Sequence, residues 1–140
     1  MTSQPTTTTD ANDSSESIVA RGATELLLCA QACSSCADAC LQEASADALR
    51  QCIRLNLDCA DVCIAASALA ARTQGLNDVV LVQTLEVCAT AAQRCAEECE
   101  RHAKQYQHCA RCAVECRRCE EVCRLTMQVI GGASGLVQTN

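Results

Sequence analysis

Between residues 18 and 130, small and apolar residues recur at spacings of three, four and seven, with polar residues between them. These spacings return to one face of an α-helix, whereas a strand would repeat every two residues. The clearest case is CARCAVECRRCEEVC, at Cys109–Cys123, where cysteines follow one another at gaps of three and four. Pro is absent from this stretch, and Ala, Leu, Glu, Gln and Arg predominate, as in helices. The pattern predicts an all-α protein.

Three interruptions divide the helical stretch. The segment SADALR, from Ser45, is typical of a new helix N-terminus. In TQGLND, Gly75 favours a helix end and Asn77 or Asp78 a new start. A weaker break lies near residues 104–107. The predicted helices are 19–44, 46–73, 77–103 and 105–130, and short connections between helices of similar length favour an antiparallel up-down four-helix bundle.

Both ends of the chain differ in composition from this stretch. Residues 1–17 are mainly Thr, Ser, Asp and Asn, which bury too little apolar surface to order a segment. The last ten residues, GGASGLVQTN, open with two glycines that favour a helix end. We therefore predict a disordered N-terminal tail over 1–17, one bundle domain over 18–130 and a flexible C-terminal tail over 131–140.

The core of the predicted bundle must be unusual, because the chain has no Phe or Trp and Tyr106 is its only aromatic residue. Fifteen cysteines are present instead, together with Ala, Leu and Val. The sequence therefore predicts a bundle with a cysteine-lined core.

Charge and targeting signals limit the partners. The net charge of -6 argues against a nucleic-acid partner, which needs clustered Lys and Arg. The N-terminus lacks a cationic segment followed by an apolar run, and no window is long and apolar enough to span a membrane. We expect a cytoplasmic protein with no membrane partner, and the reducing cytosol favours metal binding or redox chemistry over disulfides.

Each predicted helix carries its cysteines on one face, because every gap within a helix is three, four or seven. Four such stripes can face one another inside a bundle. By helix, the predicted metal ligands are Cys29, Cys33, Cys36 and Cys40; Cys52, Cys59 and Cys63; Cys88, Cys95 and Cys99; and Cys109, Cys112, Cys116, Cys119 and Cys123.

Several chemistries compete for these thiols. One or two cysteines would be small buried hydrophobes, but fifteen on four stripes argue against that interpretation. Neighbours on one helix have Cβ atoms about 5–6 Å apart, too far for a disulfide, which leaves only cross-helix bridges formed under oxidation. Iron–sulfur clusters favour cysteines on wrapping loops, and structural zinc needs closed sets of four ligands. Cu(I) fits best, since it prefers thiolate and accepts two or three ligands.

Bridging sulfurs would allow a large load. If each thiolate bridges two ions and each ion takes two sulfurs, the capacity is about 15 Cu(I) per chain. The C-x2-C pairs, such as Cys33 and Cys36, leave zinc as an alternative metal.

The ladders CAQACSSCADAC and CARCAVECRRCEEVC, in a four-helix layout from about Arg21 to Ile130, resemble those of the bacterial copper storage protein family, in its branch without an export signal. The resemblance implies a bundle that binds many Cu(I) ions along its inside. It also implies a homotetramer and storage without catalysis. A second apolar stripe on helix 46–73, with Ile53, Leu57, Ile64 and Ala68, could pack against another helix or another subunit.

Residues other than cysteine extend the predicted site. In an up-down bundle His102, Tyr106 and His108 share one end, the histidine end, where copper would enter, and both histidines are predicted ligands unless they are merely solvated. The opposite, leucine end has Leu26, Leu81, Leu85 and Met127. Three weaker ligand predictions are Met127, which otherwise packs, Asn56, which otherwise forms hydrogen bonds in the core, and Asp61, which otherwise lies at the surface.

The sequence thus favours a cytosolic, non-enzymatic store or buffer of Cu(I), supplied by a copper chaperone or a small thiol. Two other hypotheses stay open. A thiol redox buffer or sensor would need exposed cysteines of low pKa and reversible disulfides. A zinc-thiolate interaction module would contain stoichiometric zinc and unfold when a chelator removes it.

Overall fold

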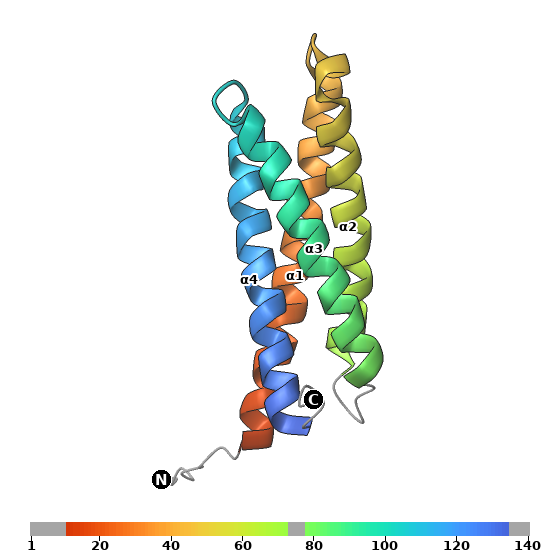
Figure 1. The fold of residues 1–140 in the computed structure, drawn as a ribbon, viewed down its shortest axis with the longest axis vertical. Helices are drawn as coiled ribbons and strands as arrows, with labels where there is room; N and C mark the ends of the chain where they lie inside the picture. Colours follow the sequence, from red (N-terminus) through yellow and green to blue (C-terminus); the bar gives the residue numbers. More distant parts are fainter. Residues whose placement is uncertain (1–10, 73–77, 135–140) are drawn as a thin grey trace, which may run out of the picture.

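The computed structural model describes residues 11–72 and 78–134, and within these ranges all regular structure is helical. The elements are α1 (Ala11–Gln42), the short 3-10 helix η1 (Ala46–Leu49), α2 (Arg50–Ala71), α3 (Asp78–His102) and α4 (Gln107–Ser134) (Figure 1). None of these helices combines the length and apolar character needed to cross a membrane.

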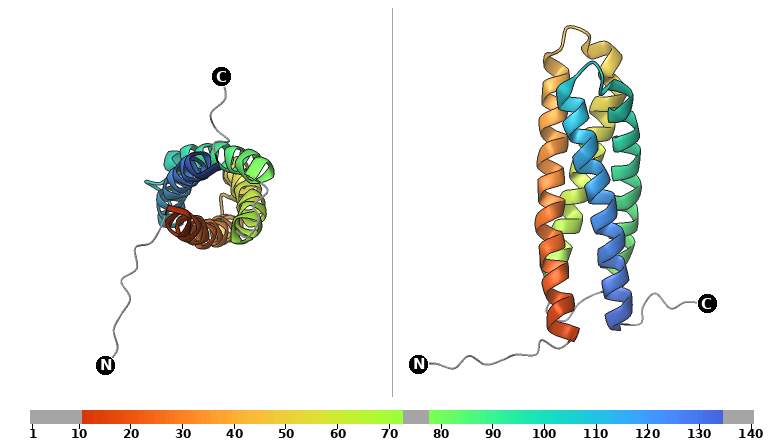
Figure 2. Two further views of the ribbon diagram at one scale, coloured as in Figure 1. Left: turned by 90° about the horizontal axis from the view of Figure 1, so that it is seen from below. Right: turned by 90° about the vertical axis from the view of Figure 1, so that its left-hand side faces the viewer.

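The four long helices form an antiparallel up-down bundle, which confirms the predicted fold. α1 packs against α2 and α3 against α4, while contacts of α1 with α4 and of α2 with α3 close the ring. Figure 2 shows this ring from its end, with the helices surrounding one central axis. Every helix therefore presents one face to the same interior.

Two helices extend beyond their predicted bounds. α1 begins at Ala11, inside the predicted N-terminal tail, and α4 continues through Gly131 to Ser134, inside the predicted C-terminal tail. Adding a residue to an existing helix costs little, because nucleation is the expensive step. Packing also opposes the glycine penalty, since Ile130 and Gly131 are buried. The tail predictions for residues 1–10 and 135–140 lie outside the described residues.

The connection between α1 and α2 also differs from expectation. Ser45 does not cap α2: its side chain makes no capping hydrogen bond, and the next four residues form η1, so α2 begins at Arg50 instead of residue 46. The Ser45 hydroxyl instead hydrogen-bonds the hydroxyl of Tyr106, just before α4. This contact joins the two connections at the histidine end. The predicted break at Gly75 lies outside the described residues.

The core is made mainly of Cys and Ala, with Leu49 of η1 buried at the histidine end and more of the larger apolar side chains near the end that holds both described termini of the chain. Leu26, Leu81, Leu85 and Ile130 are at most 2% exposed there. The second apolar stripe of α2 lies mostly outside the core, because Leu57 and Ile64 are about half exposed. That stripe is therefore available to another surface.

Candidate metal centre

All fifteen cysteines are free thiols, and none is more than 2% exposed. Their burial follows from the helical periodicity, because gaps of three, four and seven keep each stripe on the inner face of its helix. The interior of the bundle is thus a continuous row of sulfur, here called the thiol lane.

Sulfurs from different helices approach one another closely. Within one helix, contacting Sγ atoms are 3.9 to 4.0 Å apart. A d10 ion such as Zn²⁺ lies about 2.3 Å from a thiolate, so two sulfurs at this separation can share one such ion. The cross-helix Sγ pairs are Cys33 with Cys116 at 3.6 Å, Cys63 with Cys88 at 3.6 Å, Cys63 with Cys119 at 3.6 Å, Cys52 with Cys99 at 3.8 Å and Cys33 with Cys112 at 4.0 Å.

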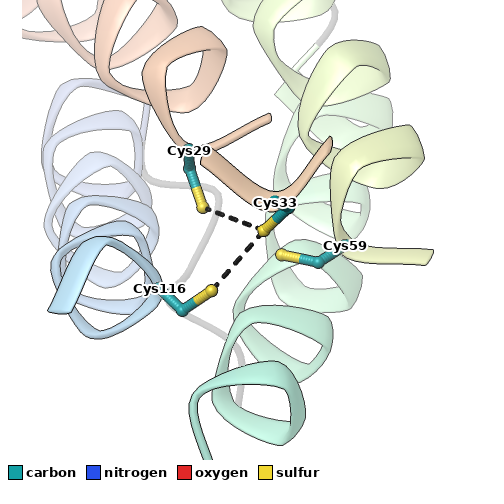
Figure 3. Close-up of side chains that lie close together, drawn as sticks. All are labelled: Cys29, Cys33, Cys59 and Cys116. Carbon is teal, nitrogen blue, oxygen red and sulfur yellow. Dashed lines mark hydrogen bonds between the residues drawn. The ribbon is translucent and has the colours of Figure 1, made fainter. Parts of the chain in front are cut away.

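These contacts build overlapping groups whose ligand atoms all lie within 4.8 Å of one another. Figure 3 shows one group, in which Cys29, Cys33, Cys59 and Cys116 converge from α1, α2 and α4. Neighbouring groups share members, so the lane is continuous. From the histidine end inward, five of these groups are Cys36, Cys40, His108 and Cys109; Cys36, Cys99 and Cys112; Cys33, Cys95, Cys112 and Cys116; Cys29, Cys33, Cys59 and Cys116; and Cys29, Cys63 and Cys119.

His108 belongs to the outermost group. Its Nδ1 lies 3.6 Å from the Sγ atoms of Cys36 and Cys109 and 3.9 Å from that of Cys40. Its other ring nitrogen, Nε2, contacts Glu43. The structure therefore brings His108 to the lane as the sequence analysis expected.

His102 lies at the same end but in another environment. Its Nε2 is 2.9 Å from Oε2 of Glu98, one turn earlier on α3, and Arg101 approaches the other oxygen of that carboxylate. Among the described residues, the side-chain hydrogen bonds of His102 go to Glu98 and not to a thiol. The two predicted histidine ligands are thus not equivalent.

Asn56 is fully buried in the lane and forms hydrogen bonds with four cysteines. Its Nδ2 donates to the carbonyl and Sγ of Cys52 and lies 3.7 Å from Sγ of Cys99. Its Oδ1 accepts from the thiols of Cys95 and Cys112, at 3.3 and 2.9 Å. These bonds satisfy the amide without metal, in agreement with the role of a polar core residue.

The two remaining predicted ligands, Met127 and Asp61, lie in different surroundings. Met127 is partly buried against the core near the leucine end. Asp61 is exposed and lines an outer groove between α2 and α3, together with Asp58 and Arg94. The structure therefore places Asp61 on the outside of the bundle.

Burial and mutual contact set the proton affinities of the thiols. Burial raises the pKa of Cys40 to about 11 and also raises the pKa of Cys109. Deeper in the lane, two touching sulfurs cannot easily both ionise. Contact with Cys112 raises the pKa of Cys33, whereas hydrogen bonds led by that from Cys116 lower the pKa of Cys59. A metal ion must displace the protons of such thiols before it binds them.

Glu43 is the residue at this site that the sequence analysis missed. It follows the end of α1 and lies three residues after Cys40, but a glutamate beside a turn usually has no special role. Its partner, His108, is 65 residues away. Only the packing of α1 against α4 shows the contact.

A bundle whose interior is a buried row of free, mutually contacting thiols defines a helical metal-thiolate protein that can hold several soft ions. Residues 15–128 match the family model described as copper storage protein, Csp. The chain belongs to the copper storage protein family. Among curated proteins, none matches this chain.

Solved structures of a Streptomyces lividans protein are similar to this chain. A cytosolic copper storage protein, described as loading copper and holding five coppers, is 43% identical with a TM-score of 0.79, covering 82% of this chain and 96% of that one. The copper storage protein Ccsp, loaded with 10 copper equivalents, is 45% identical with a TM-score of 0.77, covering 80% of this chain and 85% of that one. A variant of Ccsp with one histidine replaced by alanine is 44% identical, covers 82% of this chain and 96% of that one, and has a TM-score of 0.79.

Proposed function

We propose that this protein stores Cu(I) in the cytosol, holding many ions on thiolates that line the inside of its bundle. The observation that supports this most directly is the overlap of the thiol groups, in which Cys36, Cys112 and Cys29 each belong to two neighbouring groups. A sulfur in two groups can bridge two ions, so the lane can hold ions in a row. The copper-loaded Streptomyces lividans relatives support copper as the metal.

The arrangement of the sulfurs favours Cu(I) over zinc. Structural zinc needs separate tetrahedral sets, whereas the two groups of four cysteines share Cys33 and Cys116. Cu(I) accepts two or three thiolates, so overlapping groups of this kind suit it better. With every thiolate bridging, the capacity is about 15 ions per chain. The proposed role is storage without catalysis, because all of the thiols serve to hold ions.

We further propose that copper enters at the histidine end, delivered by a copper chaperone or a small thiol. His108 is the partly exposed member of the outermost group, with 18% of its side chain exposed, while the lane behind it is buried. Toward the other end, Leu26, Leu81 and Leu85 are buried and Met127 is partly buried, so among the described residues no polar group like His108 is exposed beside the sulfurs named there. An incoming ion would therefore meet the outermost group first.

Anaerobic titration of the reduced full chain with Cu(I), against a competing chromophoric chelator, tests the storage function. We expect uptake of well over four ions per chain with little change in helix content by circular dichroism. Saturation at one or two ions would contradict storage. Stoichiometric zinc in the isolated protein, with unfolding on chelation, would support the zinc module, and loss of thiols to reversible disulfides under mild peroxide would support the redox buffer.

Assembly as a homotetramer is also a proposal. The exposed apolar side chains Leu57 and Ile64 on α2 and Val87 on α3 provide surface for contacts between copies. Sedimentation equilibrium of the full chain should give four times the chain mass of 14.8 kDa. A monomer would contradict the assembly without affecting storage.

A further inference from the structure

Glu43 links the end of α1 to the outermost metal group. Its backbone N–H donates to the carbonyl of Cys40 at 3.2 Å, which places it beside one thiol of that group. Its Oε2 lies 3.0 Å from Nε2 of His108, at the start of α4. Glu43 therefore holds, from one helix, the ring of a residue on another.

The chemistry of this contact determines the tautomer of His108. An ionised carboxylate can only accept hydrogen bonds, so Nε2 must carry the hydrogen that it donates to Glu43. In the neutral ring the lone pair then lies on Nδ1. That atom faces the sulfurs of Cys36, Cys40 and Cys109 at 3.6, 3.9 and 3.6 Å.

We propose that Glu43 is a positioning residue that fixes His108 in the tautomer whose Nδ1 binds the first incoming ion. The metal part of this proposal depends on the proposed copper storage. Carboxylates commonly orient metal-binding histidines in this way and make the imidazole a stronger ligand. The ring centroid of Tyr106 lies 5.5 Å from that of His108, with the two planes tilted by 32°, so the tyrosine packs against the imidazole.

His102 provides a matched control inside the same chain. Its Nε2 contacts Glu98 at 2.9 Å, so the carboxylate fixes the same tautomer. Among the described residues, however, its hydrogen bonds include none to a thiol. Removing the Glu98 carboxylate should therefore change the ring of His102 without changing the first step of uptake.

The first test is the tautomer of His108 in the metal-free reduced protein, read from long-range proton–nitrogen correlations of 15N-labelled histidine. Spectra are taken at about pH 8, where ordinary histidines are neutral. We expect the Nε2–H form in the wild type and in Glu43→Gln, whose amide oxygen still accepts. Glu43→Ala should give a mixture, and Glu43→Lys, which can only donate, should favour Nδ1–H. An unchanged Nε2–H form in Glu43→Ala and Glu43→Lys would overturn the proposal.

The second test is the initial rate of anaerobic Cu(I) uptake from the competing chelator. Loss of a residue that orients a metal ligand typically costs about 10-fold to 100-fold, so we expect uptake by Glu43→Ala to be about 10-fold slower. Its final capacity should be unchanged. Glu43→Gln and the control Glu98→Ala should load at the wild-type rate.

The two tests separate the possible failures. A tautomer change with unchanged uptake by both Glu43→Ala and Glu43→Lys would overturn the positioning role. Equal slowing by Glu98→Ala would do the same, because it would indicate a general effect of negative charge at this end. If the wild type takes up no copper, the proposed storage fails, whereas the tautomer result still decides whether Glu43 fixes the ring.

Discussion

The two ends of the thiol lane differ in chemistry although the same four helices form both. At the histidine end, His108 and Glu43 lie beside the last sulfurs, and the Tyr106 hydroxyl bonds across to Ser45. At the leucine end, Leu26 and Leu85 are fully buried below the lane. Polar, partly exposed groups thus lie beside the buried Leu49 at one end, whereas packed hydrocarbon from several helices covers the other.

This difference suggests a division of roles. Buried leucines stabilise the fold through apolar burial, which is the main favourable term in folding. The polar residues of the histidine end bury less apolar surface, and they lie beside a group of side chains that can hold a metal ion. Substitutions at the leucine end should therefore act on stability, and those at the histidine end on metal uptake.

The largest expected effect is that of Leu85→Ala. Leu85 is fully buried, so its truncation should lower the free energy of unfolding of the metal-free bundle by about 2–5 kcal/mol. Urea denaturation of the reduced protein measures this. The control is Val114→Ala, on α4 and 64% exposed, which should cost far less. Equal losses would contradict a packed leucine end.

His108→Ala should have a small effect on stability and a larger effect on metal uptake. Loss of the ring removes the contact with Glu43, which should cost about 1 kcal/mol of stability. The initial rate of Cu(I) uptake should fall, because the outermost group loses its nitrogen ligand. His102→Ala is the matched control and should keep the wild-type rate. If both variants load equally slowly, both histidines take part in uptake, which would contradict the role assigned to His108 alone.

A smaller effect is expected from removing one thiol. Cys36→Ser and Cys123→Ser should each lower the Cu(I) capacity by about one ion, since a bridging thiolate is lost. Cys36 belongs to the outermost group and to the next, whereas Cys123 lies toward the leucine end. Stopped-flow uptake should therefore slow in Cys36→Ser only. Slower uptake in Cys123→Ser instead would place the entrance at the leucine end.

The last expected effect is a change in stability with pH. Burial raises the pKa of Cys40 from 9.0 to about 11, so the folded state holds this proton more tightly than the unfolded chain does. The resulting stability is present below about pH 9 and is lost as the pH rises toward 11. Thermal unfolding of the metal-free protein from pH 8 to 11 should show the decline. No decline in the wild type, or the same decline in Cys40→Ala, would contradict a buried neutral thiol.

The sequence predicted the bundle and the inner position of every cysteine, because helical periodicity alone decides which side chains share a face. Local signals were less reliable at the helix ends. Ser45 has the residue type of a cap, yet its hydroxyl bonds Tyr106, and Gly131 lies within α4. In both places tertiary contacts outweighed local preference.

Contacts between helices could not be predicted from spacing. Which sulfurs contact one another depends on the offset between the helices along the bundle axis. The spacing of cysteines within a helix does not give this offset, so it could not predict that Cys63 contacts both Cys88 and Cys119. The same holds for Glu43 and His108. For Asp61 the local spacing was misleading. Asp61 is two residues after Cys59, which suggested that it lies near the thiols, but residues two apart along a helix point in nearly opposite directions and Asp61 is exposed.

Shared sulfurs also affect how the protein would fill. Because Cys36, Cys112 and Cys29 each belong to two groups, adjacent positions are not independent, and the lane resembles a one-dimensional lattice with nearest-neighbour coupling. An ion that fixes a shared sulfur alters the free energy of binding next to it, and the influence is reciprocal. In a half-loaded sample, favourable coupling would therefore give a mixture of full and empty chains, whereas unfavourable coupling would give chains that are each partly filled.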